Sequence, residues 1–265
     1  MMSASEWSAK LMPVSAGAVF AHPSLAAVGE VGEGFFKERT EGNLPCQASE
    51  THLFCGQWAI DHIDRYVTPT LEQLALVAIS VVAGFVIAFA LAILGHRVHW
   101  LRPPLLAGTG ILFAIPSLAF FLLLLPVTGR GNETAIIALT AYTLQIIYRN
   151  VVLGLDNVPA SARDAARGMG LTSRQILWKV EVPMAVPEII AGLRIATVST
   201  VAIATLAVFA GGGGLGTQIL GEANLKFPTT IVISGVIVIL MALLFDAILL
   251  IAQRFLTPWR RVRAI

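Results

Sequence analysis

Five long apolar runs constrain this chain more than any other feature. The clearest, LEQLALVAISVVAGFVIAFALAIL at residues 71–94, is long enough to cross the hydrocarbon core of a bilayer. The others cover residues 105–126, 134–148, 189–209 and 229–252. A spanning segment must satisfy its own backbone hydrogen bonds, so each run is expected to be a helix. With 13% charged residues and a mean hydropathy of +0.79, the chain is predicted to be an all-α membrane protein with about five transmembrane helices.

Basic residues in the connecting segments predict the orientation. Lys and Arg concentrate after the first and third runs and in the C-terminal tail, at Arg97, Arg102, Arg149, Arg163, Arg167, Arg174, Lys179, Arg254, Arg260, Arg261 and Arg263. The alternate segments, at about 127–133 and 210–228, carry only Arg130 and Lys226. Because cytoplasmic loops are enriched in Lys and Arg, the C-terminus is predicted in the cytoplasm and the N-terminus outside. The expected location is the cell (inner) membrane.

Residues 1–66 differ from the rest and are predicted to form an extracytoplasmic acidic tail before a transmembrane domain at 67–265. The tail holds eight of the sixteen acidic residues but four of the eighteen basic ones. Both cysteines, Cys46 and Cys55, lie in it. An oxidising compartment would allow them to form a disulfide, although two free thiols in a tail remain the alternative.

Several functional classes lack their sequence signatures. Basic tracts with interleaved aromatics, which nucleic-acid binding favours, are missing, and so is any Cys or His cluster with metal-ligand spacing. Without a G-x-x-x-x-G-K-[ST] phosphate loop or a G-x-S-x-G elbow, the chain is not expected to be an enzyme. Neither a metal nor a cofactor is expected on it.

The cytoplasmic segment 156–186 is predicted to contain two short helices. Asp156 and Asn157 are candidate N-cap residues, with Pro159 near the first turn. Ala162, Ala165 and Ala166 then share one face, small enough for another protein's backbone to approach closely. The first helix is expected to end at Gly170 in a left-handed turn.

The second helix is expected to begin at Thr172, which forms a capping box pattern with Gln175. Pro183 and Pro187 are predicted to break the chain where it returns to the membrane.

The spacing of this segment resembles a known signature. Asp164-Ala165-Ala166, three residues, Gly170, nine residues and Val180-Glu181-Val182-Pro183 is similar to the EAA motif of importer permeases in the ATP-binding-cassette superfamily. The resemblance implies the type I permease fold and a coupling helix that docks on a separate ATPase subunit. It assigns this role to Arg163, Asp164, Ala165, Ala166, Gly170 and Pro183. An interfacial amphipathic hairpin without a partner is the alternative.

Two further segments resemble the osmoprotectant branch of that family, which carries glycine betaine, choline and carnitine. They are residues 115–119, IPSLA, and residues 210–216, AGGGGLG. Pro116 and Ser117 are therefore candidates for the translocation path, with a packed kink as the alternative for Pro116. The glycines can turn tightly or re-enter the membrane mouth, or form an ordinary external loop.

The resemblance implies a permease subunit that works by alternating access. The implied partners are ATPase subunits that bind ATP, an extracytoplasmic solute-binding protein and a second permease copy or paralogue. A secondary carrier or channel is the alternative function. It would require buried charges, whereas Glu188, Arg194 and Asp246 are expected near the cytoplasmic ends of their runs, with Asp246 and Arg254 as anchors or an ion pair there.

Overall fold

The computed structural model describes residues 54, 56–223 and 228–258, and these residues contain helices but no strand. The first half comprises α2 (Gly56–Asp61), the 3-10 turn Ile63–Tyr66, α3 (Val67–Arg97), the 3-10 turn His99–Leu101, α4 (Arg102–Ala114), α5 (Ser117–Thr128) and α6 (Asn132–Asp156). The second half comprises α7 (Ala160–Gly168), α8 (Ser173–Ile176), a π-helical turn (Leu177–Glu181), α9 (Val182–Ala204), the 3-10 turn Thr205–Ala210, α10 (Gly216–Ala223) and α11 (Pro228–Leu256).

The all-helical membrane fold predicted from the apolar runs is confirmed. Among the residues that the structure describes, four helical segments are long and apolar enough to cross a membrane, and α4 with α5 would make a fifth if the bent pair counts as one span. The third segment is longer than expected, since α6 runs from Asn132 to Asp156 rather than from 134 to 148. Helical residues also begin at Gly56, before the expected domain boundary, and Tyr66 is buried in the core.

The second span is broken rather than merely kinked. α4 and α5 meet at an angle of 97°. Ile115 is extended (ψ 130°), and Pro116 has no N–H with which to continue the ladder of α4. The freed Ile115 carbonyl accepts a hydrogen bond from the Tyr142 hydroxyl of α6, so the break is compensated by a neighbouring helix.

Small residues allow α3, α6 and α9 to pack closely. A Cβ at Gly84 of α3 would collide with the Thr143 side chain of α6. A Cβ at Gly192 of α9 would meet the Asn150 side chain, and one at Gly154 of α6 would lie 3.1 Å from the Ala185 carbonyl oxygen. Close approach at small residues is a common mode of helix association in membranes, and it makes this trio the centre of the fold.

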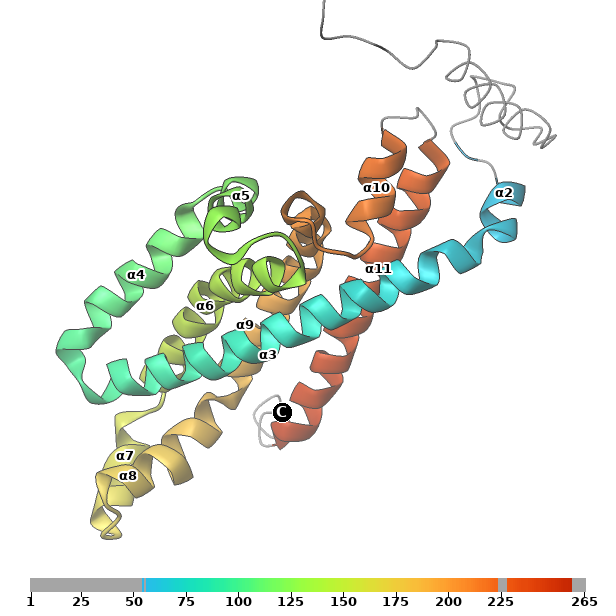
Figure 1. Cartoon of the computed structure of the whole chain (residues 1–265). Coiled ribbons are helices and arrows are strands. Elements are labelled where there is room, and N and C mark those ends of the chain that lie inside the picture. The colour runs from blue at the N-terminus through green and yellow to red at the C-terminus, as the bar shows by residue number, and fades with distance from the viewer. Residues whose placement is uncertain (1–53, 55, 224–227, 259–265) are drawn as a thin grey trace, which may run out of the picture. The chain divides into compact units, whose positions relative to one another are not determined.

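Figure 1 shows α7 and α8 together beyond one end of α6 and α9, whereas α10 lies at the opposite end of α9. One core cluster surrounds Leu139, Tyr142 and Leu215, and a second surrounds Tyr148, Leu155 and Leu177 on the α7–α8 side. By contrast, only 6% of an 18-residue apolar stretch of α11 is buried. Most of the apolar surface of α11 is therefore left uncovered by the other described residues.

Candidate functional site

The α7–α8 hairpin carries the predicted coupling residues, and its turn forms as the sequence indicates. Gly170 has φ +78°, which confirms the expected left-handed turn. The Gly170 N–H donates to the Arg167 carbonyl at 2.9 Å, and the Leu171 N–H donates to the Ala166 carbonyl at 3.2 Å. These bonds satisfy carbonyls at the end of α7, so the chain can reverse without losing hydrogen bonds.

The caps of the two helices differ in outcome. The Thr172–Gln175 capping box is confirmed, with the Thr172 N–H donating to Gln175 Oε1 at 2.8 Å. The predicted Asp156 and Asn157 caps are wrong: Asp156 ends α6, and Pro159 occupies the N-cap of α7 without a side-chain bond. The Asp156 carboxylate instead pairs with Arg102 at the start of α4, a contact between segments that local pattern does not reveal.

The alanines of α7 do not form one open face. Ala166 is 1% exposed, whereas Ala165 is exposed and Ala162 is half-buried. Exposed Asp164 accepts a hydrogen bond from Arg167 at 3.2 Å, with both side chains more than 65% exposed. The surface open to a partner therefore includes Asp164, Ala165, Arg167 and Met169.

Arg163 points back into the protein. Its Nε donates to Glu181 Oε1 at 2.6 Å, and its Nη2 donates to the Leu155 carbonyl at 2.7 Å. Arg163 thus ties α7 to the end of α6 and to the turn that precedes α9.

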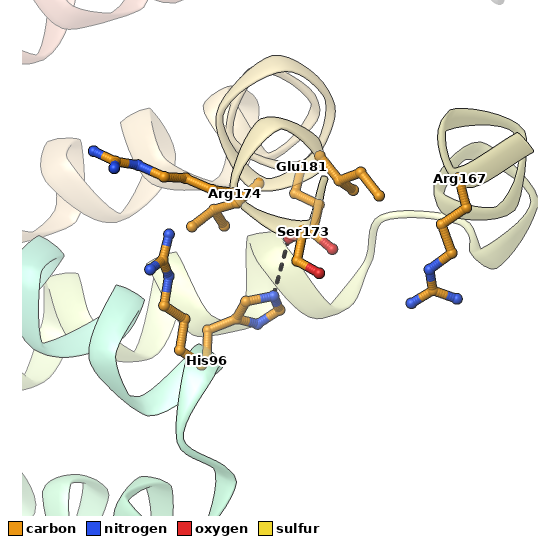
Figure 2. Close-up of a pocket in the computed structure, with 8 residues that line it drawn as sticks. His96, Arg167, Ser173, Arg174 and Glu181 are labelled. Atoms are coloured by element: carbon orange, nitrogen blue, oxygen red, sulfur yellow. Dashed lines mark hydrogen bonds and ion pairs between the residues drawn. The ribbon is translucent and has the colours of Figure 1, made fainter. Parts of the chain in front are cut away.

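Glu181 is the centre of this network, and sequence reasoning missed it. His96 Nε2, at the end of α3, lies 3.1 Å from Glu181 Oε2, as the dashed line in Figure 2 marks. The Glu181 side chain is 10% exposed, so its charge is compensated mainly by Arg163. The sequence did offer one signal for this residue. Glu181 is an acid at the variable position of Val180-Glu181-Val182-Pro183, and the nearest charged residues before it, Arg174 and Lys179, are basic.

A cavity of about 440 Å³ opens beside this network between the end of α3 and the α8 region. Figure 2 shows its polar lining, with His96 and Glu181 facing one another. Its lining residues are His96, Arg97, Arg167, Ser173, Arg174, Ile176, Leu177 and Glu181. Three arginines make this side of the hairpin strongly basic.

The prolines after the hairpin do not break the chain, contrary to expectation. Residues 173–210 form one continuous helical segment, with a π-helical turn at Leu177–Glu181. Pro183 lies in the first turn of α9, where a missing N–H is tolerated. Pro187 lies inside α9, and its carbonyl accepts from Gln253 Nε2 of α11 at 3.0 Å. The continuous helix links the hairpin directly to the membrane.

At the candidate path residues, Pro116 is exposed and Ser117 is half-buried at the bend between α4 and α5. The Tyr142 ring beneath the bend packs edge-on against Phe113 and Phe120, with ring centroids 5.9 Å and 5.7 Å away. Packing and a hydrogen bond therefore hold the bend in place.

The glycine-rich segment forms a packed turn rather than a loose external loop. The Gly214 N–H donates to Glu72 Oε2 at 2.9 Å, and the Leu215 N–H donates to Gln73 Oε1 at 3.3 Å. Gln73 is fully buried, and its Nε2 also donates to the Val201 carbonyl at 3.0 Å. Polar Glu72 and Gln73 within a spanning run were the signal for this contact.

Arg194 and Asp246 form an ion pair between α9 and α11. Arg194 Nε donates to Asp246 Oδ1 and Nη2 donates to Oδ2, both at 2.8 Å. The predicted pairing of Asp246 with Arg254 is therefore wrong, because α11 turns Asp246 toward α9. Arg194 lies twelve residues after Val182, the first residue of α9, or about 18 Å along the helix.

Cys46 and Cys55 lie outside the described residues, so their pairing stays a prediction. Among residues 54, 56–223 and 228–258, no group of three His, Cys, Asp or Glu side chains could hold a metal ion.

Comparisons with known proteins agree on the class. The family model described as "Binding-protein-dependent transport system inner membrane component" matches residues 80–262. The choline transport permease OpuBB of Bacillus subtilis is 34% identical over 71% of this chain and 87% of its own length. The osmoprotectant import permease OsmW of Salmonella typhimurium is 34% identical over 76% of this chain and 96% of its own length.

Solved structures extend the likeness to the fold. The inward-facing MetNI methionine ABC transporter matches with a TM-score of 0.67 and 25% identity, over 72% of this chain and 95% of that chain. An amino acid ABC transporter crystallised with histidines matches with a TM-score of 0.64 and 17% identity, over 75% and 97%.

Proposed function

This chain belongs to the family of binding-protein-dependent transport system inner membrane components, and we propose that it is the permease of an importer for a small osmoprotectant such as glycine betaine, choline or carnitine. One observation carries the proposal. Identity of 34% extends over 87% or more of the length of three permeases named for choline, osmoprotectant, or glycine betaine, carnitine and choline transport. The relatives are transport permeases rather than enzymes. Transport through this chain would take place in the cytoplasmic membrane.

The α7–α8 hairpin would contact a separate ATPase. Its exposed surface of Asp164, Ala165, Arg167 and Met169 mixes charge with apolar contact area, as protein interfaces do. Arg163 would then transmit the displacement of α7, because it bonds to both the α6 end and the start of the α9 segment. ATP would bind to the partner subunit and not to this chain.

Two further partners belong to the proposal. A solute-binding protein outside the membrane would supply the solute and carry specificity. A second copy or a paralogue of this chain would complete the passage. The apolar stretch of α11, of which only 6% is buried, leaves surface that lipid or that copy could cover. Alternating access would follow from rotation of the two permeases against one another.

A secondary carrier is the second candidate, because Arg194 and Asp246 place an ion pair within two spans. The two candidates differ in their energy source. An importer stops when ATP hydrolysis is blocked even if the ion gradient is maintained, whereas a carrier continues.

The test begins with the tagged chain purified in mild detergent from its own host. We expect an ATPase subunit to co-purify, and proteoliposomes of this complex with its binding protein to import glycine betaine or choline when ATP is supplied. Gly170→Val should abolish both co-purification and uptake, because a β-branched residue strains at φ +78°. Gly170→Asn is the matched control, since asparagine tolerates a positive φ at the same position and should retain co-purification and uptake.

Uptake that persists without ATP would replace the importer by the carrier. A Gly170→Val chain that binds ATPase and imports normally would remove the coupling role from the hairpin. An ATP-dependent complex that imports neither osmoprotectant would retain the permease class and overturn the solute class.

A further inference from the structure

A groove between α9 and α11 lies apart from the coupling hairpin, because none of its lining residues belongs to that hairpin. Its volume is about 540 Å³, and its lining includes Arg194, Ile195, Val198, Ser199, Leu243 and Asp246. The groove thus combines apolar walls with one positive and one negative side chain. It is open on one side, so a small molecule can reach both charges.

The two charges remain accessible although they bind one another. The Arg194 and Asp246 side chains are 26% and 33% exposed, respectively. Both belong to helical segments long and apolar enough to cross a membrane, and Asp246 precedes the end of α11 by ten residues, or about 15 Å. A charged pair exposed to hydrocarbon is costly, so the open side of the groove is expected to face water or a polar cargo rather than lipid.

The groove matches one solute chemistry closely. A small zwitterion with a carboxylate and a quaternary ammonium needs a cation for one end, an anion for the other and apolar contact for its methyl groups. The planar Arg194 fork suits a carboxylate, and the Asp246 carboxylate suits the ammonium. Exposed Val198 and Leu243 supply apolar surface beside the charges.

We propose that the Arg194–Asp246 groove is a low-affinity binding site for such a zwitterion during its passage, an inference that rests on the proposed function. The solute carboxylate replaces one Asp246 contact on Arg194, and its ammonium approaches the oxygen so released. When the solute leaves, the two side chains bind each other again at the observed 2.8 Å. The ion pair therefore competes with the solute, which keeps affinity low and favours release.

The test measures direct binding to the purified permease complex without its solute-binding protein. Glycine betaine in the 0.1 M range should raise the thermal midpoint of the complex by about 3 °C. Choline and acetate should each raise the thermal midpoint less, because choline has an alcohol in place of the carboxylate and acetate lacks the ammonium. Arg194→Gln should remove the advantage of glycine betaine over choline, and Asp246→Asn should weaken binding of both.

Two controls address folding and site identity. The double variant R194Q/D246N leaves no unpaired charge, so it should assemble normally and yet bind no glycine betaine. Arg254→Gln changes an arginine of α11 outside the groove and should leave the thermal shift unchanged.

Three outcomes overturn the proposal. The first is an equal glycine betaine shift of the thermal midpoint in wild type and R194Q, and the second is equal shifts by glycine betaine and choline in wild type. The third is dissociation of permease copies in R194Q/D246N, which would make the groove a subunit contact. ATP-driven uptake of glycine betaine by the wild-type complex tests the proposed function separately. Uptake without any direct binding defeats only the groove, whereas absence of uptake of every osmoprotectant defeats the proposed function.

Discussion

The segments on either side of α9 reverse the chain by different means. Before α9, the α7–α8 hairpin keeps Asp164, Ala165 and Arg167 exposed. It is attached to the spans by the continuous helix 173–210 and by the hydrogen bonds of Arg163. After α9, the turn at 211–216 donates backbone N–H groups to Glu72 and Gln73 of α3. One segment leaves a surface for a partner, and the other uses its backbone to fix the first span against the fourth.

Glycine has different functions in these two segments. At Gly170 the requirement is conformational, because φ is +78° and no atom of the described residues would lie within 4 Å of a Cβ added there. At Gly213 and Gly216 the requirement is steric, since a Cβ would collide with the Glu72 carboxylate or the Thr205 carbonyl. Substitutions should therefore affect function at the first segment and folding at the second.

The largest effect is expected for Gly216→Ala. Its Cβ would collide with the backbone of Thr205, which cannot move as a side chain can, and overpacking of this kind costs about 3 kcal/mol. Fluorescence-detected size-exclusion chromatography after heating should show a markedly lower midpoint than wild type. Gly221→Ala, in α10 with open space around it, should leave the midpoint unchanged. Equal midpoints for the two variants would show that the 211–216 turn is loose.

The next largest effect compares the largely buried Arg163–Glu181 ion pair of the hairpin with its exposed Arg167–Asp164 pair. Glu181→Ala leaves Arg163 without its carboxylate partner, and loss of one member of a largely buried pair costs roughly 3 kcal/mol. Asp164→Ala removes an exposed contact of at most about 0.5 kcal/mol. Thermal midpoints of the two variants should differ by several degrees. If Asp164→Ala destabilises as much as Glu181→Ala, the hairpin is not held through Arg163.

A smaller effect than that of Glu181→Ala is expected at the capping box. Thr172→Ala removes the side chain that accepts from the Gln175 N–H at 3.4 Å, and loss of an N-cap typically costs about 1 kcal/mol. Amide hydrogen exchange should increase locally in residues 173–176 while the global midpoint changes little. Ser173→Ala is the control, because the Ser173 hydroxyl takes no part in the capping box. Unchanged exchange in Thr172→Ala would show that packing alone holds α8.

Sequence predicted what depends on neighbouring residues in the chain. The five apolar runs became helices because their length and hydropathy suit a bilayer, and Gly170 and the Thr172–Gln175 box formed because both are local geometries. The family resemblance identified the hairpin from its residue spacing alone. The coupling role stays a prediction for all six residues to which it was assigned, Arg163, Asp164, Ala165, Ala166, Gly170 and Pro183.

What sequence missed depends on which helices pack together. Asp156 was expected to cap α7 but pairs with Arg102, and Asp246 pairs with Arg194 rather than Arg254. In each case an ionisable side chain found its partner on another helix, 52 or 54 residues away. Local patterns carry no information about that choice. The role of Glu181 likewise depends on its contacts with His96 at the end of α3 and with Arg163 of α7.

The break at Pro116 has a consequence for biogenesis. With 13 and 12 residues, α4 and α5 are each about 20 Å long, which is shorter than the roughly 30 Å hydrocarbon core. Neither half can be integrated as an independent stop-transfer segment, and the Ile115 carbonyl is satisfied by Tyr142 of α6, which is synthesised later. The bent pair is therefore expected to reach its final position only after α6 has been synthesised, whereas α3 alone can anchor the nascent chain in the membrane.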